Sequence, residues 1–124
     1  MQTILIVDDE QNIRNILDFS LAAEGYQVIE ACDGHEAMIL ALAERPDLII
    51  LDVMMPYTDG FEVCRRLKKD MRTSTIPVIM LTAKNSRDDR RRGENMKADA
   101  YITKPFSPRR LLDTVQSFLG VTKG

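Results

Sequence analysis

The sequence has few of the residues that build covalent or metal crosslinks. It contains two cysteines, Cys32 and Cys64, which are far apart and have no CxxC or histidine-rich context. We interpret both as free thiols in a reducing compartment. The single histidine, His35, begins a segment that we expect to be helical, and we expect it at the surface. A disulfide framework or a structural zinc site is therefore not expected.

Long apolar runs are also missing. No segment is apolar enough to span a membrane, and the N-terminus lacks the basic-then-apolar pattern of a signal peptide. The formal net charge is only -2, which favours neither a nucleic-acid binder nor a disordered acidic chain. The P-loop pattern GxxxxGKS/T is absent. We therefore expect a cytoplasmic domain that contacts neither membrane nor nucleic acid directly.

Short apolar runs alternate with amphipathic segments along the whole chain. Five runs, rich in isoleucine, valine and leucine, are typical of buried parallel strands: residues 3–7, 27–31, 47–51, 77–81 and 99–103. This alternation predicts an α/β protein with a doubly wound, five-stranded parallel sheet covered by five helices. A length of 124 residues fits one domain over residues 1–124, with residues 120–124 as a tail or the start of a linker.

The expected helices differ in their apolar faces. After Asp9 as a candidate cap, the first helix has the stripe Ile13, Ile16, Leu17 and Leu21. Ser107 and Pro108 begin the last helix, whose stripe is Leu111, Leu112, Val115, Phe118 and Leu119. The fourth helix, residues 86–96, has almost no apolar stripe. We expect this fourth helix to be the most weakly packed.

Polar residues gather where the expected strands end. Asp8 and Asp9 follow the first strand, Asp52 the third and Thr82 the fourth, while Lys104 follows the fifth. Each alone has a simpler interpretation, such as a helix cap, a turn residue or a solvated surface side chain. Ligands of open parallel sheets bind at this edge, so we expect the five to meet in one pocket. Close carboxylates repel one another unless a cation joins them, and oxygen ligands alone favour Mg²⁺.

Four motifs together carry a family resemblance over essentially the whole chain. They are "ILIVDDE", "PDLIILDVMMPYTDGFEVCRRLK", "PVIMLTA" and "KADAYITKPF". In this order and spacing they resemble the receiver domain of two-component response regulators, of which the single-domain chemotaxis regulator is the simplest relative. The resemblance implies a flavodoxin-like fold with strand order 2-1-3-4-5.

The resemblance also implies roles for the strand-end residues. Asp52 resembles the phosphoacceptor, which takes a phosphoryl group from a histidine kinase or phosphotransfer protein. Asp9 resembles the direct Mg²⁺ ligand and Asp8 a ligand that acts mostly through water, and Asp52 and the backbone carbonyl of Met54 would complete the set. Lys104 resembles the lysine that pairs with a phosphoryl oxygen.

Further positions are implied by the same resemblance. Thr82 and Tyr101 look like the switch pair, which would alter the face formed by the fourth helix, fifth strand and fifth helix. Met54 and Lys84 occupy rim positions that influence how water reaches the phosphoryl group. The bond Lys104–Pro105 resembles a cis peptide. The output partner or domain is unspecified, and the chain is expected as a monomer or a phosphorylation-dependent dimer.

Other functions fit the sequence less well. A haloacid-dehalogenase-type phosphatase needs a second acid two residues after its nucleophile, where this chain has Met54. A flavodoxin-like redox protein needs a hydroxyl- and glycine-rich loop where this chain has "VDDEQN". A pseudo-receiver, with the fold but silent phosphorylation, stays open. The chain is therefore not expected to be an enzyme beyond its own phosphorylation and dephosphorylation.

Overall fold

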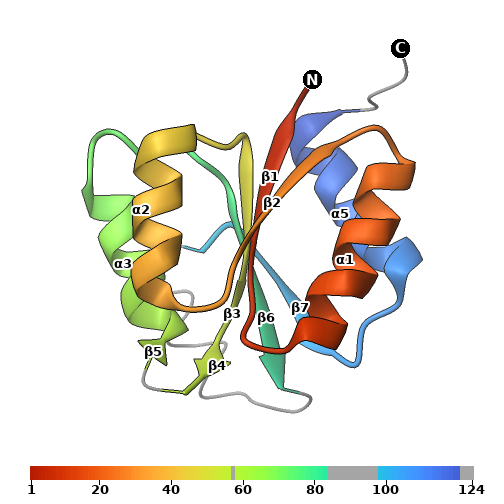
Figure 1. Ribbon diagram of the computed structural model, residues 1–124. Helices are drawn as coiled ribbons and strands as arrows, with labels where there is room; N and C mark the ends of the chain where they lie inside the picture. Colours follow the sequence, from red (N-terminus) through yellow and green to blue (C-terminus); the bar gives the residue numbers. More distant parts are fainter. Residues whose placement is uncertain (57, 84–97, 121–124) are drawn as a thin grey trace.

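The computed structural model describes residues 1–56, 58–83 and 98–120. Its centre is a five-stranded parallel sheet in the order β2-β1-β3-β6-β7 (Figure 1). The strands are β1 (Thr3–Val7), β2 (Gln27–Ala31), β3 (Leu48–Asp52), β6 (Val78–Ala83) and β7 (Ala100–Lys104). Every residue of β3 is buried, as its central place between covering helices requires.

Helices cover both faces of this sheet, so the fold is a three-layer, flavodoxin-like α/β arrangement. One face packs against α1 (Gln11–Ala23) and α5 (Pro108–Leu119), and the other against α2 (Gly34–Glu44) and α3 (Gly60–Lys69) (Figure 1). Each face has its own buried apolar cluster. No helix in the described ranges is long and apolar enough to cross a membrane.

The element count differs from the sequence prediction. A short antiparallel pair, β4 (Met54–Met55) and β5 (Thr58–Asp59), lies between β3 and α3. The observed strand order therefore departs from the predicted 2-1-3-4-5, because this pair takes the fourth and fifth places along the chain. Two-residue strands leave no apolar run that a sequence pattern can detect. The described residues hold four helices, and the predicted fourth helix, residues 86–96, lies outside them.

The helix starts follow capping chemistry, with one exception. The side chains of Asp33, Asp59 and Ser107 accept hydrogen bonds from backbone N–H groups at the starts of α2, α3 and α5. The prediction that Asp9 caps α1 is wrong. That helix begins at Gln11 after Glu10, and the Glu10 side chain makes no capping bond.

The later strands extend further than predicted. The third was expected at residues 47–51, but it begins at Leu48 and includes Asp52. Asp47 precedes it and makes two bonds with Thr3, through its backbone N–H (2.7 Å) and its carboxylate (2.8 Å). The fourth and fifth strands likewise continue to Ala83 and Lys104. Asp52, Thr82 and Lys104 therefore belong to the sheet, whereas Asp8 and Asp9 lie in the loop after β1.

Two residues predicted for the helix stripes lie outside the core. Ile16 of α1 is 45% exposed and Phe118 of α5 is 38% exposed. The prediction of free thiols is confirmed, since Cys64 is buried, Cys32 is exposed, and neither forms a disulfide. His35 is exposed, as expected.

Candidate functional site

Strand alternation places three charged residues on one face of the sheet. In β1, Ile4 and Ile6 face α1 and α5, so the two-residue period turns Asp8 to the same side. The same period in β3 and β7 turns Asp52 and Lys104 to that side. Because β1 and β3 are neighbours, the sheet brings the two acids together at its carboxyl edge.

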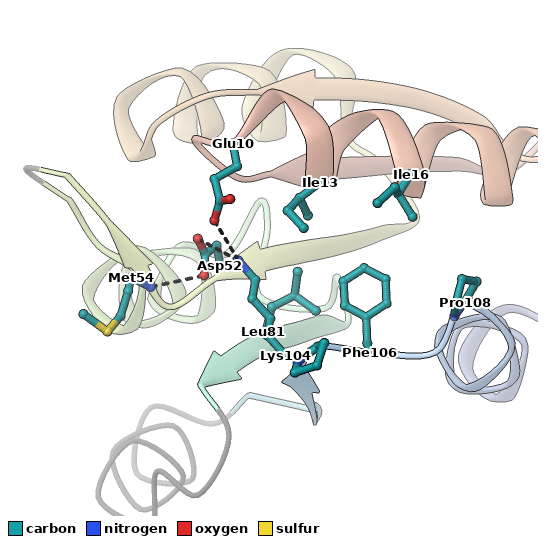
Figure 2. Close-up of a pocket in the computed structure, with 10 residues that line it drawn as sticks. Glu10, Ile13, Ile16, Asp52, Met54, Leu81, Lys104, Phe106 and Pro108 are labelled. Carbon is teal, nitrogen blue, oxygen red and sulfur yellow. Dashed lines mark hydrogen bonds and ion pairs between the residues drawn. The ribbon is translucent and has the colours of Figure 1, made fainter.

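The Lys104 ammonium lies at the centre of this group. Its Nζ atom is 3.0 Å from Asp8 Oδ2, 3.3 Å from Asp52 Oδ2 and 3.9 Å from Glu10 Oε1. Figure 2 shows Glu10 and Asp52 converging on it from different elements. Asp8 is fully buried, and Asp52 is 3% exposed. The bond Lys104–Pro105 is cis, as the resemblance implied.

Burial sets the electrostatics of the site. The pKa of Asp52 is raised to about 6, because burial and the nearby charge of Asp8 raise it by more than Lys104 and the Met54 N–H lower it. Burial alone would lower the pKa of Lys104, but its contacts with Asp8 and Asp52 raise it overall. Lys104 is therefore a permanent cation, and Asp52 is an unusually basic carboxylate.

Arg14 supports the loop that carries the acidic residues. Its Nη1 donates a 2.7 Å hydrogen bond to the backbone carbonyl of Asp8, and its Nε donates a 3.1 Å bond to Glu30 on β2. The arginine side chain is only 13% exposed. Sequence reasoning missed this residue, because no local pattern links a helical arginine to a carbonyl six residues earlier.

Carboxylates outnumber cations at this edge. Asp8, Asp9 and Glu10 each place an oxygen within 4.8 Å of the others. With Asp52 they make four carboxylates, against the Lys104 ammonium and the Arg14 guanidinium, among the described residues. Glu10 was not among the predicted ligands, although it is the third acid of the quoted "VDDE". Oxygen donors and this excess of negative charge fit the chemistry of Mg²⁺.

Thr82 and Tyr101 lie on the opposite face of the sheet. Tyr101 packs against the apolar cluster under α2 and α3, and Thr82 lies two residues after Met80 of the same cluster, so the strand period turns it to that face. Thr82 Oγ1 is buried and has no hydrogen-bond partner among the described residues. The Tyr101 ring is partly buried, and its hydroxyl oxygen is enclosed. The structure therefore places this pair beside, not inside, the group around Lys104.

Of the two predicted rim positions, the structure describes Met54 but not Lys84. Met54 is 70% exposed, and its backbone N–H donates a 3.3 Å hydrogen bond to Asp52 Oδ1 (Figure 2). This N–H contact holds the acid in place, whereas the sequence had suggested only the Met54 carbonyl. Lys84 lies outside the described residues.

A cavity of about 600 Å³ opens beside Asp52. It runs between α1 and the loop that joins β7 to α5 (Figure 2). Its lining residues are Glu10, Ile13, Ile16, Asp52, Met54, Leu81, Lys104, Pro105, Phe106 and Pro108. The site can therefore admit a ligand larger than water to the Asp52 carboxylate.

Comparison with known proteins finds relatives among transcriptional regulators and chemotaxis proteins. The phosphate regulon transcriptional regulatory protein PhoB of Pseudomonas aeruginosa is 48% identical over 118 residues, which are 95% of this chain and 52% of that protein. The chemotaxis protein CheY4 of Vibrio cholerae is 36% identical with a TM-score of 0.90, covering 95% of this chain and 98% of that one. The chain spans about half the length of the curated relatives that it matches.

A third relative was solved with a metal ion. The receiver domain of the sensor histidine kinase PA1611 of Pseudomonas aeruginosa holds a magnesium ion in its active-site cleft. It is 29% identical with a TM-score of 0.88, and the match covers 96% of this chain and 98% of that one. The family model for the response regulator receiver domain matches residues 4–116. The chain therefore belongs to the response regulator receiver domain family of two-component signalling.

Proposed function

We propose that the chain is a phosphorylation-controlled switch in which Asp52 accepts the phosphoryl group. The observation that carries this proposal is a nearly buried carboxylate at the end of a rigid strand, 3.3 Å from an ammonium group and open to a cavity. A carboxylate held in this way is suited to act as a nucleophile toward phosphorus. Residues 1–124 would form one receiver domain, with residues 120–124 as a tail or linker.

The transfer is a displacement at phosphorus. An Asp52 oxygen attacks the phosphorus of a phosphohistidine on a histidine kinase or phosphotransfer protein. The new O–P bond forms as the P–N bond breaks, and the electron pair leaves with the imidazole nitrogen. The Lys104 ammonium balances charge on the phosphoryl oxygens without leaving its place beside Asp8. Because burial and the charge of Asp8 raise the pKa of Asp52 to about 6, the acid is mostly ionised at neutral pH and more basic than an ordinary aspartate.

The acidic residues would hold a magnesium ion. Asp8, Asp9, Asp52 and the Met54 backbone carbonyl are the proposed ligands, and Glu10 would add a further carboxylate near them. When bound, Mg²⁺ supplies positive charge that screens the carboxylates from the incoming phosphoryl anion. The buried Asp8 is paired with Lys104, so its carboxylate would be held in place, and the exposed Asp9 lies beside it in the sequence.

Thr82 would carry the signal away from Asp52. Its buried hydroxyl, without a hydrogen-bond partner among the described residues, is suited to bond a phosphoryl oxygen. Tyr101 lies on the same face one strand away, so a shift of Thr82 would change the space available to its ring. The surface around the segment 86–96, β7 and α5 would then present a different shape to an output partner or domain.

Intact mass measurement tests the central step. Wild type incubated with Mg²⁺ and phosphoramidate is expected to gain one phosphoryl group, and chelator is expected to abolish the gain. Asp52→Asn keeps the side-chain shape and should gain none. A chain that folds and binds Mg²⁺ but gains no mass, even from a phosphorylated histidine kinase, would be a pseudo-receiver. An equal gain in both proteins would mean that a residue other than Asp52 accepts the phosphoryl group.

A further inference from the structure

Glu10 has a side chain that helix capping does not explain. It holds the N-cap position of α1, but its side chain makes no capping hydrogen bond. Its backbone is held on both sides, because its N–H donates a 2.9 Å hydrogen bond to Asp8 Oδ1 and its carbonyl accepts a 3.1 Å bond from the Arg14 N–H. The side chain itself is 62% exposed. A fixed backbone position therefore carries a solvated carboxylate at the start of α1.

The Glu10 carboxylate lies at the polar end of the cavity beside Asp52. It lines this cavity with Asp52 and Lys104, and Figure 2 shows it pointing toward the Lys104 ammonium. Its distance of 3.9 Å from Lys104 Nζ is longer than those of Asp8 and Asp52, at 3.0 and 3.3 Å. A long, exposed ion pair of this kind contributes little to stability. Lys104 is engaged mainly by the two buried acids, so the charge of Glu10 acts on whatever enters the cavity.

A phosphodonor that reaches Asp52 comes close to this charge. Asp52 is only 3% exposed, so its carboxylate is approached through the cavity that Glu10 also lines. Both residues have an oxygen near Lys104 Nζ, at 3.9 and 3.3 Å. These two oxygens are therefore at most about 7 Å apart, which is within the screening length of about 8 Å at physiological salt. The negative charge of Glu10 is therefore felt at the position of the incoming phosphoryl group.

We propose that Glu10 is a specificity-determining residue that disfavours small-molecule phosphodonors in proportion to their negative charge. The inference rests on the proposed phosphorylation of Asp52. At pH 7 acetyl phosphate is a dianion, whereas phosphoramidate, whose nitrogen is protonated, is a monoanion. Glu10 repels the dianion more strongly, and bound Mg²⁺ leaves this difference in place because Glu10 is not among the proposed ligands. The carboxylate therefore lowers the rate with acetyl phosphate more than the rate with phosphoramidate.

Both donors react at Asp52 by the same displacement, without another reactant. An ionised Asp52 oxygen attacks phosphorus and forms the new O–P bond. With acetyl phosphate the P–O bond to the acetyl group breaks, and the electron pair leaves on acetate. With phosphoramidate the P–N bond breaks, and the protonated nitrogen takes the electron pair and leaves as ammonia. The donors therefore differ in charge and leaving group but transfer the same phosphoryl group.

The test compares Glu10→Gln with wild type, since glutamine keeps the shape of the side chain and removes its charge. Rates of phosphorylation by acetyl phosphate and by phosphoramidate are followed by intact mass at pH 7. Calorimetry fixes the Mg²⁺ concentration that saturates each protein, and that concentration is used in every reaction. Asp18→Asn is the matched control, because it removes one carboxylate from the same helix, outside the cavity lining. Thermal melts confirm that each variant is folded.

The ratio of the acetyl phosphate to the phosphoramidate rate constant is the deciding quantity, since comparing it between variants cancels the donors' intrinsic reactivity. At low salt we expect Glu10→Gln to raise this ratio by about three- to tenfold, as one further unit charge on the donor implies at this distance. Asp18→Asn should keep the wild-type ratio. At about 1 M salt the screening length is only about 3 Å, so the ratios of Glu10→Gln and wild type should converge.

Failure of this inference and failure of the proposed function are distinguishable. If phosphoramidate modifies Asp52 but the ratio is the same in wild type and Glu10→Gln, the inference is overturned and the phosphoacceptor role stands. An equal rise in Asp18→Asn, or a rise in Glu10→Gln that persists at high salt, would also overturn it, because a local charge would then not be the cause. If neither donor modifies the wild-type chain, the reaction of Asp52 with small donors is rejected together with this inference.

Discussion

The buried carboxyl group of Asp52 leads to a quantitative prediction about stability and pH. Its pKa is raised from the usual 3.8 to about 6, first by burial and then by the charge of Asp8. The folded chain therefore holds this proton more tightly than the unfolded chain, and stability falls as the pH rises through that interval. Each pKa unit corresponds to about 1.4 kcal/mol, so ionised Asp52 costs the folded chain about 3 kcal/mol above pH 7 without a bound cation.

Asp52→Asn tests this cost directly, because asparagine keeps the shape of the side chain and removes its charge. In chelator at pH 8, we expect the free energy of unfolding of the variant to exceed that of wild type by about 2–3 kcal/mol. At pH 4 the wild-type carboxyl is protonated in the folded chain, so the difference should shrink below about 1 kcal/mol. Added Mg²⁺ should stabilise wild type more than the variant, because it binds the ionised folded site.

Urea unfolding followed by far-UV circular dichroism is the suitable assay, since the sequence has no tryptophan. Both proteins are measured in chelator from pH 4 to pH 8. Asp113→Asn is the matched control, because it removes a carboxylate whose side chain is 58% exposed. A difference between Asp52→Asn and wild type that is equal at pH 4 and pH 8 would refute the reasoning, as would a less stable variant at pH 8.

Three further substitutions probe the surroundings of the site. Arg14→Met removes the hydrogen bond to the Asp8 carbonyl and should weaken Mg²⁺ affinity about tenfold by calorimetry; unchanged affinity would deny Arg14 a positioning role. Gly60→Ala would place a Cβ atom 2.3 Å from the Asp52 backbone oxygen and should lower the free energy of unfolding by about 2 kcal/mol or more. Equal urea midpoints would contradict that close packing. Met54 is 70% exposed and apolar, so Met54→Asn, which can hold a water near the phosphoryl group, should shorten the phosphorylated lifetime by intact mass; the same lifetime would reject this role.

The placement of the strand-end residues was predictable because it follows two local rules. Apolar runs identify the five long strands, and the two-residue period then decides the face that each following polar residue occupies. Asp8, Asp52 and Lys104 share a face for this reason, and their contacts at 3.0 and 3.3 Å are its consequence. The cap at Ser107 followed from local hydrogen bonding in the same way.

Features that depend on distant contacts were not predictable from these patterns. Arg14 bonds the carbonyl of Asp8 and the side chain of Glu30 at once, and neither contact leaves a periodic signal. Ile16 has the spacing of a core residue but lines the cavity, because the wall opposite comes from the segment containing Phe106. The spacing of apolar residues along a helix can be read from the sequence. Which of those residues are buried depends on the elements that pack against the helix.

The sheet separates the chemistry from the proposed switch. Asp52 faces the layer of α1 and α5, whereas Thr82 and Tyr101 face the layer of α2 and α3. Asp52 is paired with Leu81, so Thr82 is only one residue further along the adjacent strand. Under the proposed function, a phosphoryl group on Asp52 would therefore meet Thr82 at the edge of the sheet, although the two side chains start on opposite faces. β3 is buried along its whole length, so the proposed switch would place its movement in the side chains of Thr82 and Tyr101 rather than in this strand.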